Sequence, residues 1–145
     1  MDEAEARRRL LAEPFVVLAT HGPEGRIDLV PCCVAELAAA DDGRLVSVVD
    51  HKPKRHQRLA RLRNIEADGA VTLLADGRSD DWSRLWWVRV HATASVVDDG
   101  PLHAAAVDAL VAGYAQYRHR RPDGPAIVIE PERWTGWAAT PLDGS

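Results

Sequence analysis

Residues 82–97, WSRLWWVRVHATASVV, alternate between apolar and polar side chains over a longer run than any other segment of the chain. The even positions are mostly apolar: Trp82, Trp86, Val88, Val90, Ala92, Ala94 and Val96. The odd positions include Trp87, Arg89, His91, Thr93 and Ser95. Successive side chains of a strand point to opposite faces, so this pattern predicts one long strand with one face on the core.

The other face of this strand carries an aromatic ring near a cation. Trp87 and Arg89 are two residues apart and therefore share that face. A ring beside a cation suits a flat anionic ligand or a partner subunit. Composition alone favours packing or a dimer interface over ligand contact, and both interpretations stay open.

Shorter elements flank the long strand. Residues 70–76 (AVTLLAD) are typical of a strand, and the polar loop GRSDD follows them. Residues 98–101 (DDGP) signal a helix start, with Ala106, Leu110, Val111, Tyr114 and Tyr117 on one side of the helix that follows. Residues 126–129 (AIVI) predict a last buried strand, and residues 130–133 (EPER) predict a turn into a tail that holds Trp134 and Trp137.

The first half of the chain predicts more antiparallel strands. Residues 3–13 predict a short amphipathic helix, residues 15–20 and 26–37 a hairpin, and residues 44–50 a third strand. Short antiparallel strands interrupted by helices favour a mainly β fold, a small β-barrel with helical plugs. Since no repeat or linker divides the chain, we expect one domain over residues 1–145, with a flexible tail at 138–145.

Bulk properties narrow the class of protein. The chain has 145 residues and a formal net charge of -4. This length is small for an enzyme that encloses a cofactor unaided, and dimerisation would relieve that limit. No apolar run approaches the roughly 18 residues of a membrane span, and the start MDEAEARRRLL lacks the apolar core of a signal peptide. We therefore expect a cytoplasmic protein. Cys32 and Cys33 are adjacent, which excludes a CxxC site and favours small buried side chains in a strand.

A basic segment follows the third predicted strand. Residues 48–65, VVDHKPKRHQRLARLRNI, contain no acid between Asp50 and Glu66 but six cations: Lys52, Lys54, Arg55, Arg58, Arg61 and Arg63. Pro53 suits the first turn of a helix, and Leu59, Leu62 and Ile65 supply an apolar stripe. Cations at a helix N-terminus make a cradle for phosphate or carboxylate. The alternative is a solvated basic helix face.

Sequence signatures of several enzyme classes are absent. The chain contains no P-loop, no G-x-G-x-x-G after a strand, no H-E-x-x-H and no G-x-S-x-G. The six histidines are scattered, so no metal site is predicted. No acid/base pair stands out and no catalytic residue is assigned, so any redox chemistry would be that of a cofactor.

The order of these motifs resembles the split β-barrel flavin and deazaflavin oxidoreductases, and within them the actinobacterial, pyridoxamine-5'-phosphate-oxidase-like proteins that use coenzyme F420. The resemblance covers about residues 3–137. Its specific parts are D-x-K-P-K at residues 50–54 and D-W-x-x-L-W-W-V-R at residues 81–89, and N-I-x-x-D-G-A-V at residues 64–71 is shared more loosely.

The resemblance implies an FMN-binding split β-barrel that forms a homodimer with cofactor clefts at the interface. The cofactor phosphate would lie on Lys52, Lys54 and Arg55. The ring system would lie along Ser47, Val48, Val49 and Asp50, with Pro31 nearby. Trp86, Trp87 and Arg89 would help form the cleft from either subunit, with Trp87 and Arg89 preferred on the ligand side because Trp86 faces the other way.

The expected function is hydride transfer between reduced F420 and a small organic substrate. F420 carries a phosphate and several glutamates, so Arg55, His56 and Arg58 would suit it better than the shorter anion of FMN. The alternatives are an FMN-dependent oxidase or reductase of the same fold, and a non-catalytic carrier of F420 or another flat ligand. Binding to nucleic acid is weakly supported, because the chain is acidic overall.

Overall fold

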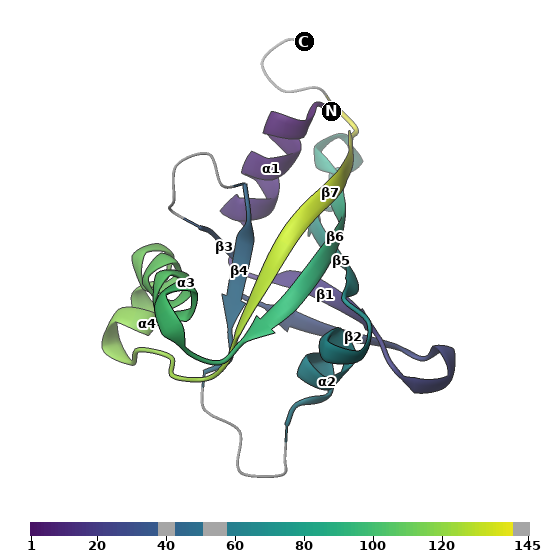
Figure 1. Cartoon of the computed structure of the whole chain (residues 1–145). Helices are drawn as coiled ribbons and strands as arrows, with labels where there is room; N and C mark the ends of the chain where they lie inside the picture. The colour runs from purple at the N-terminus through teal and green to yellow at the C-terminus, as the bar shows by residue number, and fades with distance from the viewer. Residues whose placement is uncertain (38–42, 51–57, 141–145) are drawn as a thin grey trace.

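The structure is a computed structural model that describes residues 1–37, 43–50 and 58–140 (Figure 1). These residues form one seven-stranded antiparallel sheet in the order β2-β1-β5-β6-β7-β4-β3. The strands are β1 Val16–His21, β2 Ile27–Cys32, β3 Ala35–Glu36, β4 Leu45–Val48, β5 Ala70–Gly77, β6 Trp86–Val97 and β7 Ala126–Ala138. The helices are α1 Glu3–Ala12, α2 Ala60–Ala67, α3 Gly100–Gly113 and α4 Ala115–His119. The fold is mainly β with helices, as the sequence predicts.

The sheet is rolled into a split barrel. β2 and β3 stand at opposite edges of the strand order, yet only Cys33 and Val34 connect them. Three Cα–Cα steps span at most about 11 Å, so the two edges of the sheet must curl toward each other. The Tyr114 hydroxyl lies 3.2 Å from both the backbone N–H and the carbonyl oxygen of Val34, and so holds this connection against the helices. The predicted strand over residues 26–37 is therefore two strands.

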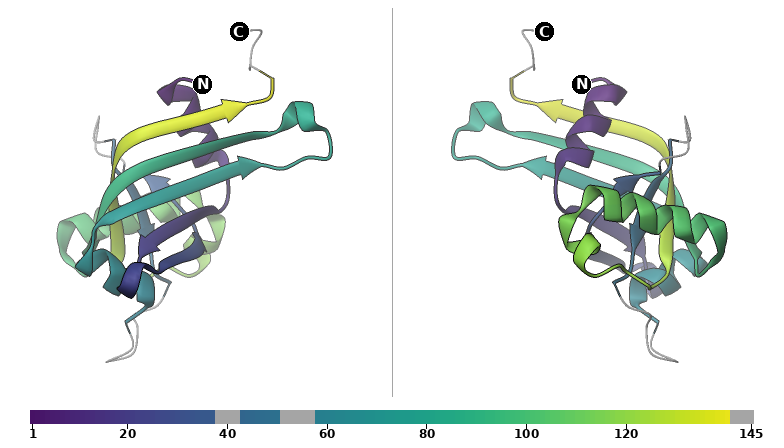
Figure 2. Two further views of the ribbon diagram at one scale, coloured as in Figure 1. Left: turned by 90° about the vertical axis from the view of Figure 1, so that its right-hand side faces the viewer. Right: turned by 90° about the vertical axis from the view of Figure 1, so that its left-hand side faces the viewer.

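Two apolar clusters stabilise the barrel. The larger one fills its interior, where α1 contributes Leu10 and α2 contributes Leu62. These two helices approach the sheet from opposite ends in Figure 1, which fits the predicted helical plugs. The smaller cluster lies between the opposite face of β4 and α3, the helix that crosses in front of the sheet in the right-hand view of Figure 2. β4 is thus buried on both faces.

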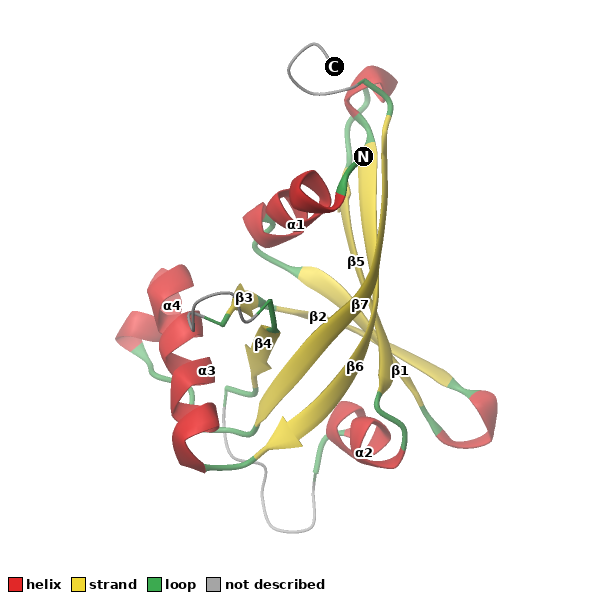
Figure 3. Cartoon of the chain, turned by 45° about the horizontal axis from the view of Figure 1, so that its top comes forward, coloured by secondary structure: helices red, strands yellow, loops and turns green. Residues whose placement is uncertain are grey.

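β6 carries the predicted core face. Val88, Val90, Ala92 and Ala94 are all buried, while the odd positions from Arg89 to Ser95 are exposed. Figure 3 shows β6 between β5 and β7. The strand begins later than predicted, because residues 82–84 form a single 3₁₀ turn and the Trp82 side chain is 77% exposed.

β7 is much longer than the predicted strand over residues 126–129. It runs through 13 residues, and the predicted turn at residues 130–133 is a β-bulge within it. Ala92 lies opposite Pro131 and His91 lies opposite Arg133, so Glu132 is the extra residue. A bulge tolerates proline because it leaves a ladder hydrogen bond unmade. The residues predicted as a tail, 134–137, therefore belong to the sheet.

Two predicted helices differ from the observed ones. The helix after the basic segment begins at Ala60, and Leu59 precedes it with a non-helical backbone, so it does not run unbroken from Pro53. Pro53 itself lies outside the described residues. The helix predicted after residue 98 breaks at Tyr114, which separates α3 from α4. No helix in the described part of the chain is long and apolar enough to cross a membrane.

Candidate functional site

The three cations predicted to hold a phosphate, Lys52, Lys54 and Arg55, lie outside the described residues, as does His56. The structure does describe the residues on either side of them, Asp50 and Arg58. These two residues and their surroundings define the candidate site from both ends of the basic segment.

β4 leads into this site with buried side chains. Ser47, Val48 and Val49 are exposed by only 5%, 5% and 7%. Their side chains pack into the protein, so only their backbone could meet a ligand. The Val49 N–H donates to the Pro125 carbonyl at 2.9 Å, and the Val49 carbonyl accepts from the Gly124 N–H at 3.0 Å.

The N–H and C=O groups of Val48 point in the opposite direction from those of Val49. Neighbouring residues of an antiparallel strand direct their polar groups to opposite sides, so the Val48 N–H and C=O face away from β7. On that side the pairing of β3 covers only Leu45 and Val46. A donor and an acceptor thus stand just past the end of β3, at the split of the barrel.

Asp50 is exposed and held at a hollow beside the helices. Its carboxylate accepts a hydrogen bond from the Tyr117 hydroxyl at 3.1 Å, and its carbonyl accepts from the Asp123 N–H at 3.3 Å. The hollow has a volume of about 330 Å³. It is lined by Phe15, Cys33, Asp50, Gln116, Tyr117 and Arg120. It therefore offers two aromatic rings, a thiol, a carboxylate, a guanidinium and an amide to a small ligand.

The weak acids of this region keep their protons at neutral pH. Burial, followed by the neighbouring Cys33 and then Asp50, raises the pKa of Tyr117, which therefore donates to Asp50 as a neutral hydroxyl. Burial also raises the pKa of the Cys33 thiol. For Cys32, burial raises the pKa to about 11, against a smaller lowering by a hydrogen bond with Ser47. Neither thiol is activated as a nucleophile.

Pro31, Trp87 and Arg89 lie on the outer face of the sheet. The Arg89 guanidinium carbon is 5.2 Å from the centroid of the Trp87 ring, so the predicted pair of ring and cation is present. Pro31 faces Val17 on β1, Val17 faces Leu74 on β5, and Leu74 faces Arg89 on β6. Three strand spacings separate Pro31 from Arg89, which is about 14 Å.

Trp86 points to the opposite face, as the alternation predicts. It packs on the interior cluster, and the Arg9 guanidinium lies 5.3 Å from its ring centroid. A Cβ on Gly77 would lie only 1.9 Å from the Trp86 indole nitrogen, so the ring rests directly on the glycine backbone. Trp86 also lines a second hollow of about 470 Å³ with Arg9 and Arg84.

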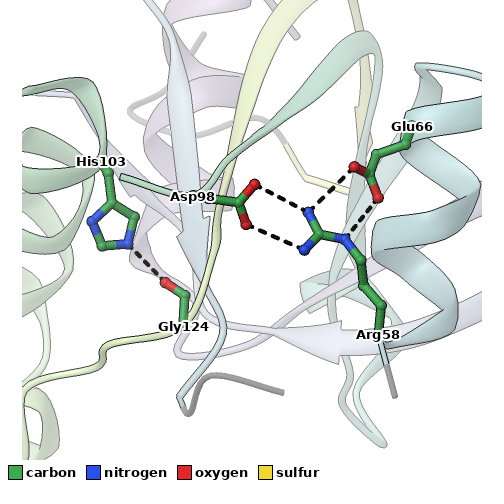
Figure 4. Close-up of polar contacts among 5 residues, drawn as sticks. All are labelled: Arg58, Glu66, Asp98, His103 and Gly124. Carbon is green, nitrogen blue, oxygen red and sulfur yellow. Dashed lines mark hydrogen bonds and ion pairs between the residues drawn. The ribbon is translucent and has the colours of Figure 1, made fainter. Parts of the chain in front are cut away.

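Arg58 makes contacts that the charge pattern did not indicate. Its guanidinium bonds Glu66 on α2 at 2.7 and 3.3 Å and Asp98, between β6 and α3, at 3.2 and 3.5 Å (Figure 4). The expectation that Arg58 suits a long anion stays a prediction, and in the structure two carboxylates already bond this guanidinium. Asp98 is 40 residues away in sequence, so no local signal could have paired the two.

Among the predicted residues that the structure describes, all but Trp86 form two separate groups within one chain. One group is the end of β4 with Asp50, close to Cys32 and hence to its neighbour Pro31. The other group is Trp87 with Arg89, about 14 Å from Pro31 across the sheet. Sequence analysis missed Tyr117, Cys33 and Arg120 as neighbours of Asp50. No group of three or more metal-binding side chains occurs among the described residues.

Comparisons with known proteins agree on the fold. The family model described as pyridoxamine 5'-phosphate oxidase matches residues 2–138. A conserved hypothetical protein of Mycobacterium tuberculosis is 20% identical with a TM-score of 0.75, covering 96% of this chain and 86% of that chain. A FAD-binding protein of Mesorhizobium loti is 17% identical with a TM-score of 0.69, covering 94% of this chain and 92% of that one.

A third solved structure has the same fold. The heme storage protein of Vibrio cholerae is 15% identical with a TM-score of 0.69, covering 94% of this chain and 93% of that one. No curated protein sequence matches the chain. At these identities the solved structures show the fold alone.

Proposed function

The chain belongs to the pyridoxamine 5'-phosphate oxidase family, and on that premise we propose that it is an oxidoreductase with a flavin-type cofactor. F420 is the first candidate, and FMN is the alternative. The reaction would be hydride transfer between the reduced cofactor and a small organic substrate. The observation that supports this best is the end of β4, where the Val48 backbone faces away from β7 and Asp50 lines a hollow of about 330 Å³.

The residues at the end of β4 fit a flat heterocycle. A flavin-type ring carries a row of donors and acceptors along one edge, and the Val48 N–H and C=O offer the complement on a strand that is rigid because both its faces are buried. A hollow of this size lies at the small end of the range for ligand pockets. In this proposal Lys52, Lys54 and Arg55 hold the cofactor phosphate.

The protein's own part is binding, orientation and exclusion of water. When bound, the cofactor supplies the hydride chemistry. Tyr117 keeps its proton, fixes the Asp50 carboxylate and closes one wall of the hollow. Arg120 and Gln116 give the hollow a polar wall for the substrate. No residue is assigned as the catalytic acid.

A second copy of the chain would complete the cleft. Trp87 and Arg89 lie on the outer face of the sheet, about 14 Å from Pro31, and in this proposal they come from the partner of a homodimer. The outer face that carries them is also apolar: Leu29 is 67% exposed, Leu74 39% and Trp137 47%. An outer face that combines exposed apolar side chains with arginine resembles the composition of subunit interfaces.

The first experiment is an equilibrium titration of the purified protein with F420 and, separately, with FMN. Lys52→Ala and Lys54→Ala should each weaken binding by about 1–3 kcal/mol, the value of a hydrogen bond to a charged group. Arg8→Ala, on the exposed side of α1, removes the same charge and serves as the control. Unchanged affinity in the double lysine variant would remove the phosphate assignment, and binding of neither cofactor would remove the proposed function.

A carrier without catalysis is the second candidate. It is favoured by one similar solved structure, whose name describes heme storage rather than catalysis. A panel of hydride acceptors separates the two candidates. Tight cofactor binding with no turnover on any acceptor would favour the carrier, whereas turnover on one acceptor class would establish the enzyme.

A further inference from the structure

We propose that the hollow beside Asp50 binds a small planar carboxylate, in which Arg120 holds the carboxylate and Phe15 contacts the flat part of the ligand. Planar means that a double bond or an aromatic ring is joined directly to the carboxyl group. This inference names the substrate class of the proposed function and rests on that function for the role of the ligand. Binding itself is measured without the cofactor.

Arg120 brings unused hydrogen-bond donors to the hollow. The neighbouring arginines serve the fold: Arg118 donates to two carbonyl groups near the end of α3 at 3.0 and 3.2 Å, and Arg121 pairs with Asp108. The Arg120 side chain, in contrast, bonds no residue that the structure describes, although it lines the hollow. A guanidinium presents its N–H donors as a fixed planar fork, which matches the two oxygens of a carboxylate.

The backbone fixes the point from which this guanidinium starts. Arg120 ends α4 with an extended backbone, and its N–H donates to the Gln116 carbonyl at 3.1 Å. One helical turn earlier, the Tyr117 hydroxyl donates to the Asp50 carboxylate and so joins α4 to the end of β4. Arg120 therefore starts from a held position and lines the same hollow as Asp50.

The charges of the hollow favour an anion on the Arg120 side. Burial raises the pKa of the Tyr117 hydroxyl and of the Cys33 thiol, so both are neutral at neutral pH. Among the described lining residues this leaves one anion, Asp50, and one cation, Arg120. Asp50 already accepts a hydrogen bond from Tyr117, whereas the Arg120 donors have no described partner. A carboxylate therefore lies at Arg120 and away from Asp50.

Phe15 supplies a flat apolar surface in the same hollow. Its side chain is 59% exposed, while that of the next residue, Val16 at the start of β1, is buried. An aromatic ring in a concave site packs on flat conjugated groups and buries their apolar area. A hollow of about 330 Å³ lies at the small end of the range for ligand pockets, so the ligand is small as well as planar.

Cinnamate is the probe, titrated into the cofactor-free protein by calorimetry. Cinnamamide is the neutral analogue of the same shape, and cinnamylamine carries the opposite charge. The wild type should bind cinnamate at least about tenfold more tightly than cinnamamide, because a hydrogen bond between two ionised groups is stronger than one to a neutral acceptor. Tighter binding of cinnamylamine would show that Asp50 selects the ligand and would overturn the inference. Equal affinities, or no binding of cinnamate, would overturn it too.

Two variants separate the roles of the two side chains. Arg120→Gln should bind cinnamate about ten- to hundredfold more weakly and cinnamamide almost as the wild type does, because only the carboxylate loses a charged partner. Phe15→Ala should weaken both ligands alike. Arg121→Gln is the matched control, because it removes the same charge one residue further on and breaks an exposed ion pair. Equal losses in Arg120→Gln and Arg121→Gln would mean that the anion senses only the general field of the basic residues.

The outcome for the cofactor is separate from the outcome for the carboxylate. A protein that binds cinnamate through Arg120 but binds neither F420 nor FMN would keep this site and lose the proposed function. A protein that binds one of these cofactors but not cinnamate, either free or loaded with that cofactor, would keep the proposed function and lose this inference.

Discussion

Asn64 is the polar residue on which the packing of α2 depends most. It is 5% exposed, and its side-chain amide donates to the Thr20 hydroxyl at 2.9 Å and to the Asp28 carboxylate at 2.7 Å. Thr20 lies on β1 and Asp28 on β2, so one side chain joins the helix to the first hairpin. A buried amide with two partners positions the helix as well as stabilising it.

Replacing Asn64 by alanine should lower the free energy of unfolding by about 2–3 kcal/mol. The change removes two hydrogen bonds, one of them to a charged acceptor, and leaves the buried Thr20 hydroxyl without this donor. Denaturant unfolding measures the change. Gln116→Ala, at an exposed position on α4, is the control and should change stability little. A loss below about 0.5 kcal/mol would mean that water replaces both bonds.

Asp28 gives the same network a pH dependence. The hydrogen bond from Asn64, followed by that from Arg26, lowers the pKa of the Asp28 carboxyl below its ordinary value. A carboxylate with a lowered pKa stabilises the folded state fully above its unfolded pKa, and this contribution is lost as pH falls through the folded pKa. Melting temperatures of the wild type and Asp28→Asn should therefore differ near neutral pH and converge in acid. A constant difference down to pH 2 would contradict this assignment.

At the scale of single elements, the turn from β5 to β6 depends on close contact between a ring and a backbone. Gly77 ends β5, opposite Trp86 at the start of β6, and the indole ring lies directly over it. Because no side chain fits at residue 77, the Trp86 ring reaches the interior cluster and the long hairpin keeps its register.

Gly77→Ala should destabilise the protein by about 1–3 kcal/mol, the usual cost of forcing extra volume into a packed site. The Trp86 ring must move, so its fluorescence spectrum should shift as well. Gly113→Ala is the matched control, because an added Cβ there meets nothing within 4 Å and alanine favours the helix. Equal melting temperatures for the two variants would show that Trp86 relaxes without cost.

The bulge in β7 decides which residues of that strand face the core. Glu132 is the extra residue in β7. Because of it, each side chain beyond the bulge lies on the same sheet face as the β6 residue with which it pairs. Trp134 then packs on the interior cluster, under the Arg7 guanidinium at 4.9 Å, while Trp137 pairs with Trp87. The element that sequence analysis took for a turn therefore sets the register of the C-terminal half of the strand.

At the scale of the whole molecule, the apolar outer face bears on the oligomeric state. Leu29, Leu74, Trp87 and Trp137 lie on that face, and a partner would bury them. We expect a dimer by light scattering at micromolar concentration. Leu29→Asp should shift the protein toward monomer, whereas Ala104→Asp on the exposed side of α3 should not. A monomeric wild type would remove the shared cleft from the proposed function.

The amino-acid pattern was sufficient for the parts of this protein that depend on neighbours in sequence. Alternation in residues 82–97 predicts β6, its buried face and the opposite orientations of Trp86 and Trp87, because strand geometry alone places these side chains. Helical spacing likewise predicts the buried Leu62 and Leu110. The family-specific motifs predict the split barrel, which the family match confirms.

Other features depend on contacts between distant residues, and only packing brings those residues together. The strand predicted over residues 26–37 divides at Val34, where the hydroxyl of Tyr114, 80 residues away, bonds the backbone. β7 continues past Pro131 because its partner β6 is long enough to pair with it on both sides of the bulge. The sequence predicts an open anion site in the basic segment. In the structure Arg58 bonds Asp98 and Glu66, because folding places these two carboxylates beside it.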